Sequence, residues 1–204
     1  MAQITLGAEA CLAAFHDLIT DYLLAERPAH PSLREVGARL PDYLAGHGLA
    51  ASAPGIAALA RLERTHRALF DGPDALPLTM DDLRALAPED FVALAVRLIP
   101  CHALLAHQPA WSTVWEGPRA GDSVEPDASA EVVLAWRQGF TVRHRAVGDD
   151  GERAMLARAA RGATLGQLCE TFVAASPSYE EAALAGQAFA VLARWVDDGV
   201  LTRA

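Results

Sequence analysis

The amino-acid sequence predicts a mainly α-helical fold: an N-terminal helical domain followed by a winged helix-turn-helix module, which consists of a β-hairpin and three helices. Three observations predict this class. Apolar residues recur at helical spacing through most of the first 116 residues. A stretch with two glycines, two prolines and few large apolar residues follows at 117–130. Beyond it, the apolar period changes from that of a helix to that of a strand. We therefore expect a helical domain at 1–120, a linker at 121–130 and a winged-helix domain at 131–204.

The first half is predicted to contain several helices separated by prolines. A helix at 5–25 stops before Pro28, because proline disfavours helical backbone in the residue before it. Two short turns follow, divided by Pro41. The segment 54–70 has an apolar stripe opposite four charges and is predicted to be an amphipathic helix. Asp81 and Asp82 open a short helix, and a last helical stretch starts at 88–90 and continues toward residue 116.

The second half begins with two β-rich runs, EVVLAWRQGFTVRHRAV, joined by Arg137-Gln138-Gly139. Three helices should follow: one from 148–150 to about 162, one capped by Thr164, and a long one that ends at Asp197-Asp198-Gly199 before a short extended tail. A hairpin, three helices and an extended end are the parts of a winged helix.

Composition limits the classes of function. All 17 basic residues are arginine and the net charge is −9 at neutral pH, so the chain as a whole repels nucleic-acid phosphates. The three cysteines are far apart and odd in number, which is typical of reduced thiols. The first twenty residues lack the basic start of a secretory signal, and no apolar run is long enough to span a membrane. We expect a cytoplasmic protein with no membrane role.

Several segments, in this order, resemble the bacterial family of HvfC/BufC-type partner proteins, which is also described as DNA-binding domain-containing. In the first half these are HPSLREVGARLPDYL at 30–44, LARLERTHRALFDGPDALPL at 59–78 and IPCHALLAHQPAWSTVWE at 99–116. In the second half they are VVLAWRQGFTVRHRAV, GATLGQLCE and WVDDGVL, a part that is also similar, more distantly, to PqqD-like peptide-recognition modules. Ile99 and Cys101, on either side of Pro100, depart from the family pattern.

This resemblance implies a function in ribosomal peptide modification. Such proteins are partners of a multinuclear non-haem iron oxidative enzyme, which modifies cysteines in a precursor peptide that is often concerned with copper homeostasis. The partner binds the leader of the precursor and presents it, while the iron and the chemistry belong to the enzyme. The resemblance therefore implies a heterodimeric, non-catalytic protein without a cofactor of its own.

A helical metalloprotein is one alternative. Glu63 and His66 have the spacing of half a di-iron motif, but no second Glu-x-x-His occurs, and Glu63 can pair along its helix with a nearby arginine. Cys101, His102 and His107 lack the paired spacing of a zinc site. No nucleophile elbow, phosphate loop or dinucleotide fingerprint is present. The sequence thus predicts no catalytic residue and no metal ligand.

A DNA-binding regulator is the other alternative, because the second half has helix-turn-helix order. The turns that would enter the major groove, at 178–184, contain two glutamates and no basic residue. Residues 127–204 hold eight arginines against ten carboxylates, so this part alone is not basic either. Nucleic acid is therefore an improbable ligand.

Peptide capture remains, since a hairpin edge beside a helix can accept an extended peptide as one more strand. We expect contacts from Val142, Arg143, His144 and Arg145 on the second strand, and from Phe189 and Leu192 on the last helix. The two arginines share a face and could pair with acidic leader residues, although a solvated strand face explains them as well. Ordinary core packing likewise explains Phe189 and Leu192.

Trp111 and Trp115 lie just before the predicted linker. They are candidates for the interface with the enzyme, although core packing or contact between the domains explains them too.

Overall fold

The computed structural model describes residues 8–27, 32–52, 55–106, 132–176 and 181–204. The chain divides into two compact units, Met1–Arg64 and Thr65–Ala204, with the boundary inside a helix, α5 (Ile56–Phe70). The linker predicted at 121–130 lies outside the described residues. The boundary between the two units lies at residue 64, and the second unit includes segments from both sides of that predicted linker.

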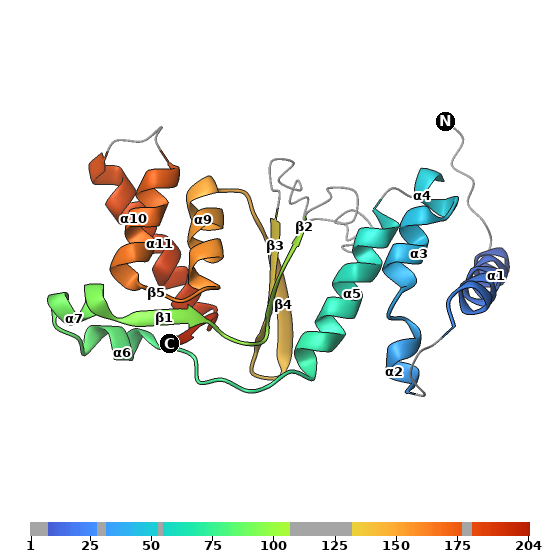
Figure 1. Cartoon of the computed structure of the whole chain (residues 1–204), viewed down its shortest axis with the longest axis horizontal. Helices are drawn as coiled ribbons and strands as arrows, with labels where there is room; N and C mark the ends of the chain where they lie inside the picture. The colour runs from blue at the N-terminus through green and yellow to red at the C-terminus, as the bar shows by residue number, and fades with distance from the viewer. Residues whose placement is uncertain (1–7, 28–31, 53–54, 107–131, 177–180) are drawn as a thin grey trace. The chain divides into compact units, whose positions relative to one another are not determined.

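The described part of the first unit is helical, as the sequence predicted (Figure 1). Its helices are α1 (Ala8–Ala25), α2 (Leu33–Val36), α3 (Leu40–Gly46), α4 (Leu49–Ser52) and most of α5. Tyr22 is buried, donates its hydroxyl hydrogen to the carbonyl of Val36 at 2.5 Å, and packs edge-on against Tyr43. These contacts join α1 to the two helices that follow it.

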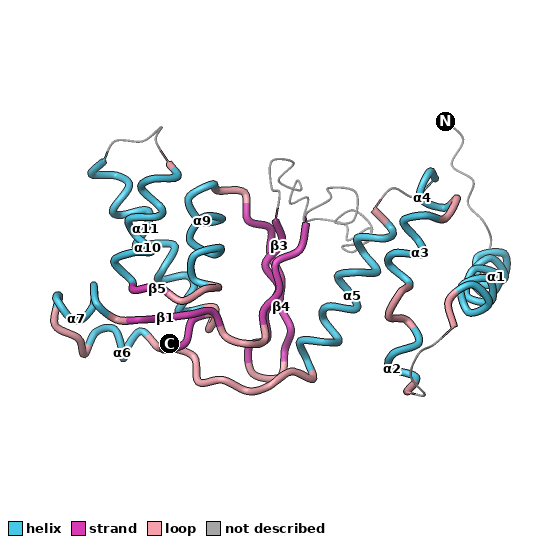
Figure 2. Tube along the Cα trace, viewed as in Figure 1, coloured by secondary structure: helices cyan, strands magenta, loops and turns pink. Residues whose placement is uncertain are grey.

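The described part of the second unit mixes helices with two three-stranded antiparallel sheets (Figure 2). Sheet one has the strand order β5-β1-β6 and sheet two has the order β2-β3-β4. The strands are β1 (Ala95–Leu98), β2 (His102–Ala106), β3 (Val132–Gln138), β4 (Thr141–Val147), β5 (Ala163–Thr164) and β6 (Leu201–Arg203). The helices are α6 (Met80–Arg84), α7 (Pro88–Ala93), α9 (Asp150–Ala159), α10 (Leu165–Ala175) and α11 (Glu181–Asp197).

The prediction of a mainly α fold with a winged helix-turn-helix module was wrong, because the arrangement is mixed α/β. The error starts at 95–106, which was expected to be helical and instead forms β1 and β2. In β1, Val96 and Leu98 are buried while Ala95 and Arg97 are exposed, so the true period is two. Four residues inside a longer apolar run do not reveal that period, because short buried strands and helices look alike in sequence.

The predicted hairpin, β3-β4, does form, but it belongs to sheet two. The winged-helix prediction required it to belong to the sheet beside the three C-terminal helices, which is sheet one. Strand β3 pairs with β4 on one side and with β2 on the other. The sheet beside α9, α10 and α11 is completed by β1, with β5 and β6 as its outer strands. Pairing partners far apart in the chain, such as Val96 and Arg203, cannot be read from local pattern.

The main core lies between sheet one, α9, α10, α11 and one face of sheet two. Its largest fully buried side chains include Trp195, Phe172 and Leu134. A Cβ at Gly151 would lie 2.6 Å from the Phe172 ring, so glycine is needed there for α9 to approach α10. Thr164 caps α10 as predicted, in a reciprocal capping box with Gln167.

None of the described helices is both long and apolar enough to cross a bilayer.

Candidate functional site

The β3-β4 hairpin presents the candidate site. Gly139 and Phe140 form its two-residue turn, with Gln138 opposite Thr141. Gly139 has a φ of 59°, and no other residue type has a positive φ among those described. Glycine at the first turn position is typical of a type II′ turn, whose twist matches that of the flanking strands. In the described part of the chain β4 pairs with β3 alone, so its other side is a sheet edge.

The edge of β4 offers backbone hydrogen-bonding groups. Residues opposite each other in an antiparallel ladder alternate between hydrogen-bonded and non-hydrogen-bonded pairs. A two-residue turn closes on a hydrogen-bonded pair, here Gln138 and Thr141. The N–H and C=O groups of Val142 and Ala146 therefore point away from β3, where an added strand would lie.

The side chains of β4 alternate between the two faces of sheet two. Arg143 and Arg145 stand opposite Trp136 and Leu134, on the face that joins the main core. Arg143 is exposed, and no described carboxylate forms an ion pair with it. Arg145 is only 21% exposed. The two arginines share a face, as predicted, but differ in what they can contact.

Arg145 is held by the buried carboxylate of Glu152 on α9. Its Nη2 and Nη1 donate to Glu152 Oε1 and Oε2 at 2.5 and 3.2 Å. Arg194 Nη2 and Trp195 Nε1, both on α11, donate to the same carboxylate, at 2.7 Å each. Arg145 therefore joins the hairpin to two helices, and its guanidinium is not available to an acidic peptide.

The charge state of Glu152 follows from these contacts. Burial by itself would raise the pKa of this carboxyl, because it disfavours the charged form. The hydrogen bonds from Arg145 and Trp195 and the charges of Arg145 and Arg194 outweigh burial and hold the pKa below its usual range. Glu152 is therefore an anion that links three elements of the second unit.

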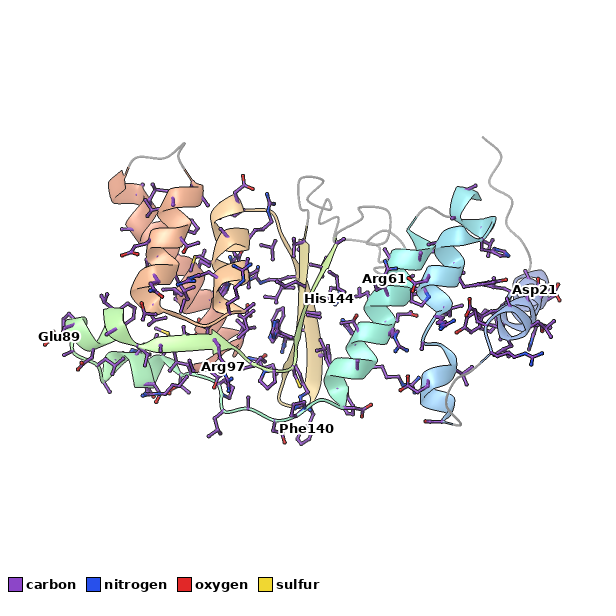
Figure 3. The ribbon with its side chains drawn as sticks, viewed as in Figure 1. Asp21, Arg61, Glu89, Arg97, Phe140 and His144 are labelled. Atoms are coloured by element: carbon purple, nitrogen blue, oxygen red, sulfur yellow. The ribbon has the colours of Figure 1, made fainter. Side chains whose placement is uncertain are left out.

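His144 lies on the opposite face of the sheet, together with Val142. Figure 3 labels His144 on the sheet. Its Nδ1 is 3.0 Å from Nε2 of His66, in the last turns of α5. Burial lowers the pKa of both imidazoles, and the charge of His66 lowers that of His144 further. Both rings are thus favoured in their neutral form. His144 packs against α5 as well as belonging to the candidate strand.

The α11 residues predicted for the same site lie elsewhere. Leu192 is 1% exposed in the main core, so its side chain does not reach the surface. Phe189 is half exposed, and its ring lies 6.2 Å from the ring of Phe91, next to α7. Trp111 and Trp115, predicted for the partner interface, lie outside the described residues.

The structure describes some of the residues that were considered as metal ligands. Cys101 is buried and donates its thiol hydrogen to the Pro73 carbonyl at 3.0 Å, and His102 Nδ1 lies 2.6 Å from the carbonyl of Ile99. His107 lies outside the described residues. Within the described ranges, no group of three or more His, Cys, Asp or Glu side chains could hold a metal ion.

The DNA alternative depends on residues 178–184. Residues 178–180 lie outside the described part of the chain. A DNA-binding helix makes most of its first contacts with the major groove through such residues. The evidence on DNA binding is therefore the acidic sequence of 178–184 itself.

Sequence reasoning missed two residues that organise the site. Glu152 occurs in the first turn of α9, where a carboxylate is usually explained by the helix dipole. Arg137 holds the loop before α6, with bonds to the carbonyls of Phe70 and Pro73. In both cases the partners are distant in sequence, and no local pattern marks them.

Comparison of this chain with models of known protein families, with curated proteins and with solved structures finds no match.

Proposed function

We propose that this protein is a non-catalytic partner subunit, which binds the leader of a ribosomally made precursor peptide and presents it to a multinuclear non-haem iron oxidative enzyme. The observation that supports this most strongly is the edge of β4, which pairs with β3 alone in the described part of the chain. An extended peptide gains main-chain hydrogen bonds by adding to such an edge.

Within this proposal, the outward backbone groups of Val142 and Ala146 pair with the peptide. Arg143, exposed on the same strand, pairs with an acidic residue of the leader through a charge-assisted hydrogen bond. Arg145 keeps the strand in place through Glu152. The peptide site therefore consists of one strand edge and one free guanidinium.

We assign enzyme docking to the first unit. Its helix α1 leaves the apolar side chains of Phe15, Leu23 and Leu24 exposed, where a partner could cover them. The resemblance of 30–44 to HvfC/BufC-type partner proteins supports the same assignment. The regulator alternative is disfavoured by the acidic turn at 178–184 and by the negative charge of residues 127–204.

The test is a calorimetric titration with the leader of a short cysteine-rich precursor encoded beside this protein, with and without the neighbouring oxidative enzyme. We expect micromolar or tighter binding, about −8 kcal/mol. Arg143→Glu should weaken binding by roughly tenfold or more, because it replaces an attraction by a repulsion. Arg97→Glu is the matched control, since Arg97 is also exposed on a strand but belongs to sheet one.

Hydrogen exchange in the same complex distinguishes strand addition from simple charge attraction. The amide hydrogens of Val142 and Ala146 should become protected when the peptide binds. Absence of binding with and without the enzyme would sink the proposal. Binding that leaves both amides unprotected would sink strand addition at β4.

A further inference from the structure

Two histidine side chains from distant parts of the chain meet beside sheet two. His66 Nε2 lies 3.0 Å from His144 Nδ1, and the centroids of the two rings are 4.9 Å apart. The residues are separated by 78 positions in the chain, and both belong to the second unit. Two imidazole nitrogens at this distance can hold a proton between them, as a hydrogen bond, or can bind one metal ion together.

The distance between the two nitrogens suits neighbouring positions around a metal ion. With metal–nitrogen bonds of roughly 2.0–2.1 Å, nitrogens 3.0 Å apart subtend an angle of about 95° at the ion. This angle is smaller than the tetrahedral angle of zinc sites and is close to the right angle between neighbours in a square plane. Tetragonal coordination by nitrogen and oxygen is typical of Cu²⁺ and Ni²⁺. The geometry therefore favours these two ions over Zn²⁺.

Both imidazoles favour the protonation state that binds a metal ion. Burial lowers the pKa of each ring, so the neutral form dominates near neutral pH. When His66 binds through Nε2 and His144 through Nδ1, each ring keeps one proton, on His66 Nδ1 and on His144 Nε2. The ion therefore replaces the hydrogen bond through a change of tautomer, and the neutral pair loses no proton.

The surroundings of the pair allow a cation to enter. Both histidines are only partly buried. Arg143 and Arg145 belong to the opposite face of the sheet, and Arg67 follows His66 on α5, where residues one apart do not face each other. Within the described ranges, no third His, Cys, Asp or Glu side chain joins the pair to make a larger ligand group. Water therefore has to complete the coordination.

We propose that His66 and His144 form a two-histidine site for a divalent transition-metal ion, Cu²⁺ or Ni²⁺, whose remaining positions are filled by water. The bound ion joins the end of α5 to β4. It does so only in the folded chain, because folding alone brings the two ligands together. The site leaves the backbone edge at Val142 and Ala146 unused, so this inference does not depend on the proposed function.

The site is tested by calorimetric titration of the full chain with Ni²⁺, which, unlike Cu²⁺, does not oxidise the three cysteines. His66→Gln and His144→Gln should each weaken binding at least about tenfold, because loss of a ligand costs no less than loss of a residue that orients one. The double variant should bind no more weakly than either single variant, since the two nitrogens act as one unit.

The control is His102→Gln. His102 is also a partly buried histidine on a strand of sheet two, but its Nδ1 lies against the Ile99 carbonyl. This variant should bind Ni²⁺ like the parent. No binding to the parent, or binding that either His66→Gln or His144→Gln retains unchanged, would show that the pair is a hydrogen bond only and would overturn the proposal.

If the glutamine variants do not fold, the parent chain tests the site by itself. Ni²⁺ should raise the midpoint of unfolding in urea relative to an equal concentration of Mg²⁺, because an ion held by both ligands binds the folded state alone. In NMR spectra, Ni²⁺ should broaden the imidazole signals of His66 and His144 together. An unchanged midpoint, or broadening of one of the two rings without the other, would overturn the two-histidine site.

The preference among ions is tested by comparing Ni²⁺ with Zn²⁺. Ni²⁺ should bind more tightly, because the angle between the nitrogens is closer to a right angle than to a tetrahedral one. Tighter binding of Zn²⁺ would overturn the assignment of the ion.

Discussion

The two faces of sheet two are covered very differently. On one face, Leu134 and Trp136 enter the main core and Arg145 binds the buried carboxylate of Glu152. On the other face, Ala135 contributes to a small cluster with Leu69 and Cys101. The difference teaches that the hairpin is anchored more strongly on one face, by the main core and the Glu152 ion pairs, than on the other, where the buried cluster is small. Its second face and its free edge can adjust at lower cost in free energy, which suits a strand that has to accept a partner.

The largest expected effect tests the anchored face. Glu152→Ala should lower the free energy of unfolding by about 3 kcal/mol, because it leaves Arg145 partly buried without its carboxylate. Urea denaturation measures this loss. Glu152→Gln is the control, since it keeps the hydrogen-bonding shape and removes the charge. A loss below about 1 kcal/mol for the alanine variant would mean that the main core alone anchors the hairpin.

A smaller effect is expected on the other face. Leu69→Ala should cost about 2 kcal/mol, at the lower end for a buried leucine, because the small cluster around it can collapse into the space. Leu134→Ala, in the main core, is the comparison and should cost clearly more. Equal losses measured by urea denaturation would contradict the difference between the two faces.

The smallest effect is the pH dependence from His66 and His144. Their lowered pKa values mean that the folded protein binds fewer protons than the unfolded chain near the ordinary histidine pKa, about 6.5. Their contribution to stability is fully present above about pH 6.5, the ordinary histidine pKa. It is lost as the pH falls from there toward the lower pKa values that the two histidines have in the folded protein. The unfolding midpoint in urea should therefore fall on acidification.

A double variant, which carries both His66→Gln and His144→Gln, tests this pair of histidines. Its midpoint should fall less on acidification than that of the parent, while His16→Gln, an exposed position on α1, should behave like the parent. An identical pH dependence in all three proteins would show that the pair contributes nothing through its protonation.

Local signals in the sequence were reliable where the structure follows local chemistry. Thr164 caps α10, and the segment at 54–70 is a helix over Ile56–Phe70. The hairpin strands were also predicted, although the turn is Gly139-Phe140 and not Arg137-Gln138-Gly139. These signals come from proline, glycine, capping residues and the apolar period. Each depends only on residues close together in the sequence, so the sequence is enough to predict its effect.

The sequence by itself determined α1, short helical turns after it, α5, the Thr164 cap, and a hairpin that carries Arg143 and Arg145. Only the tertiary structure decided that 95–106 forms two strands, that these strands complete both sheets, and that Arg145 is bound to Glu152 while Arg143 is exposed. The physical reason is that strand pairing and buried ion pairs join residues far apart in the chain. Their free energy comes from partners that no local window contains.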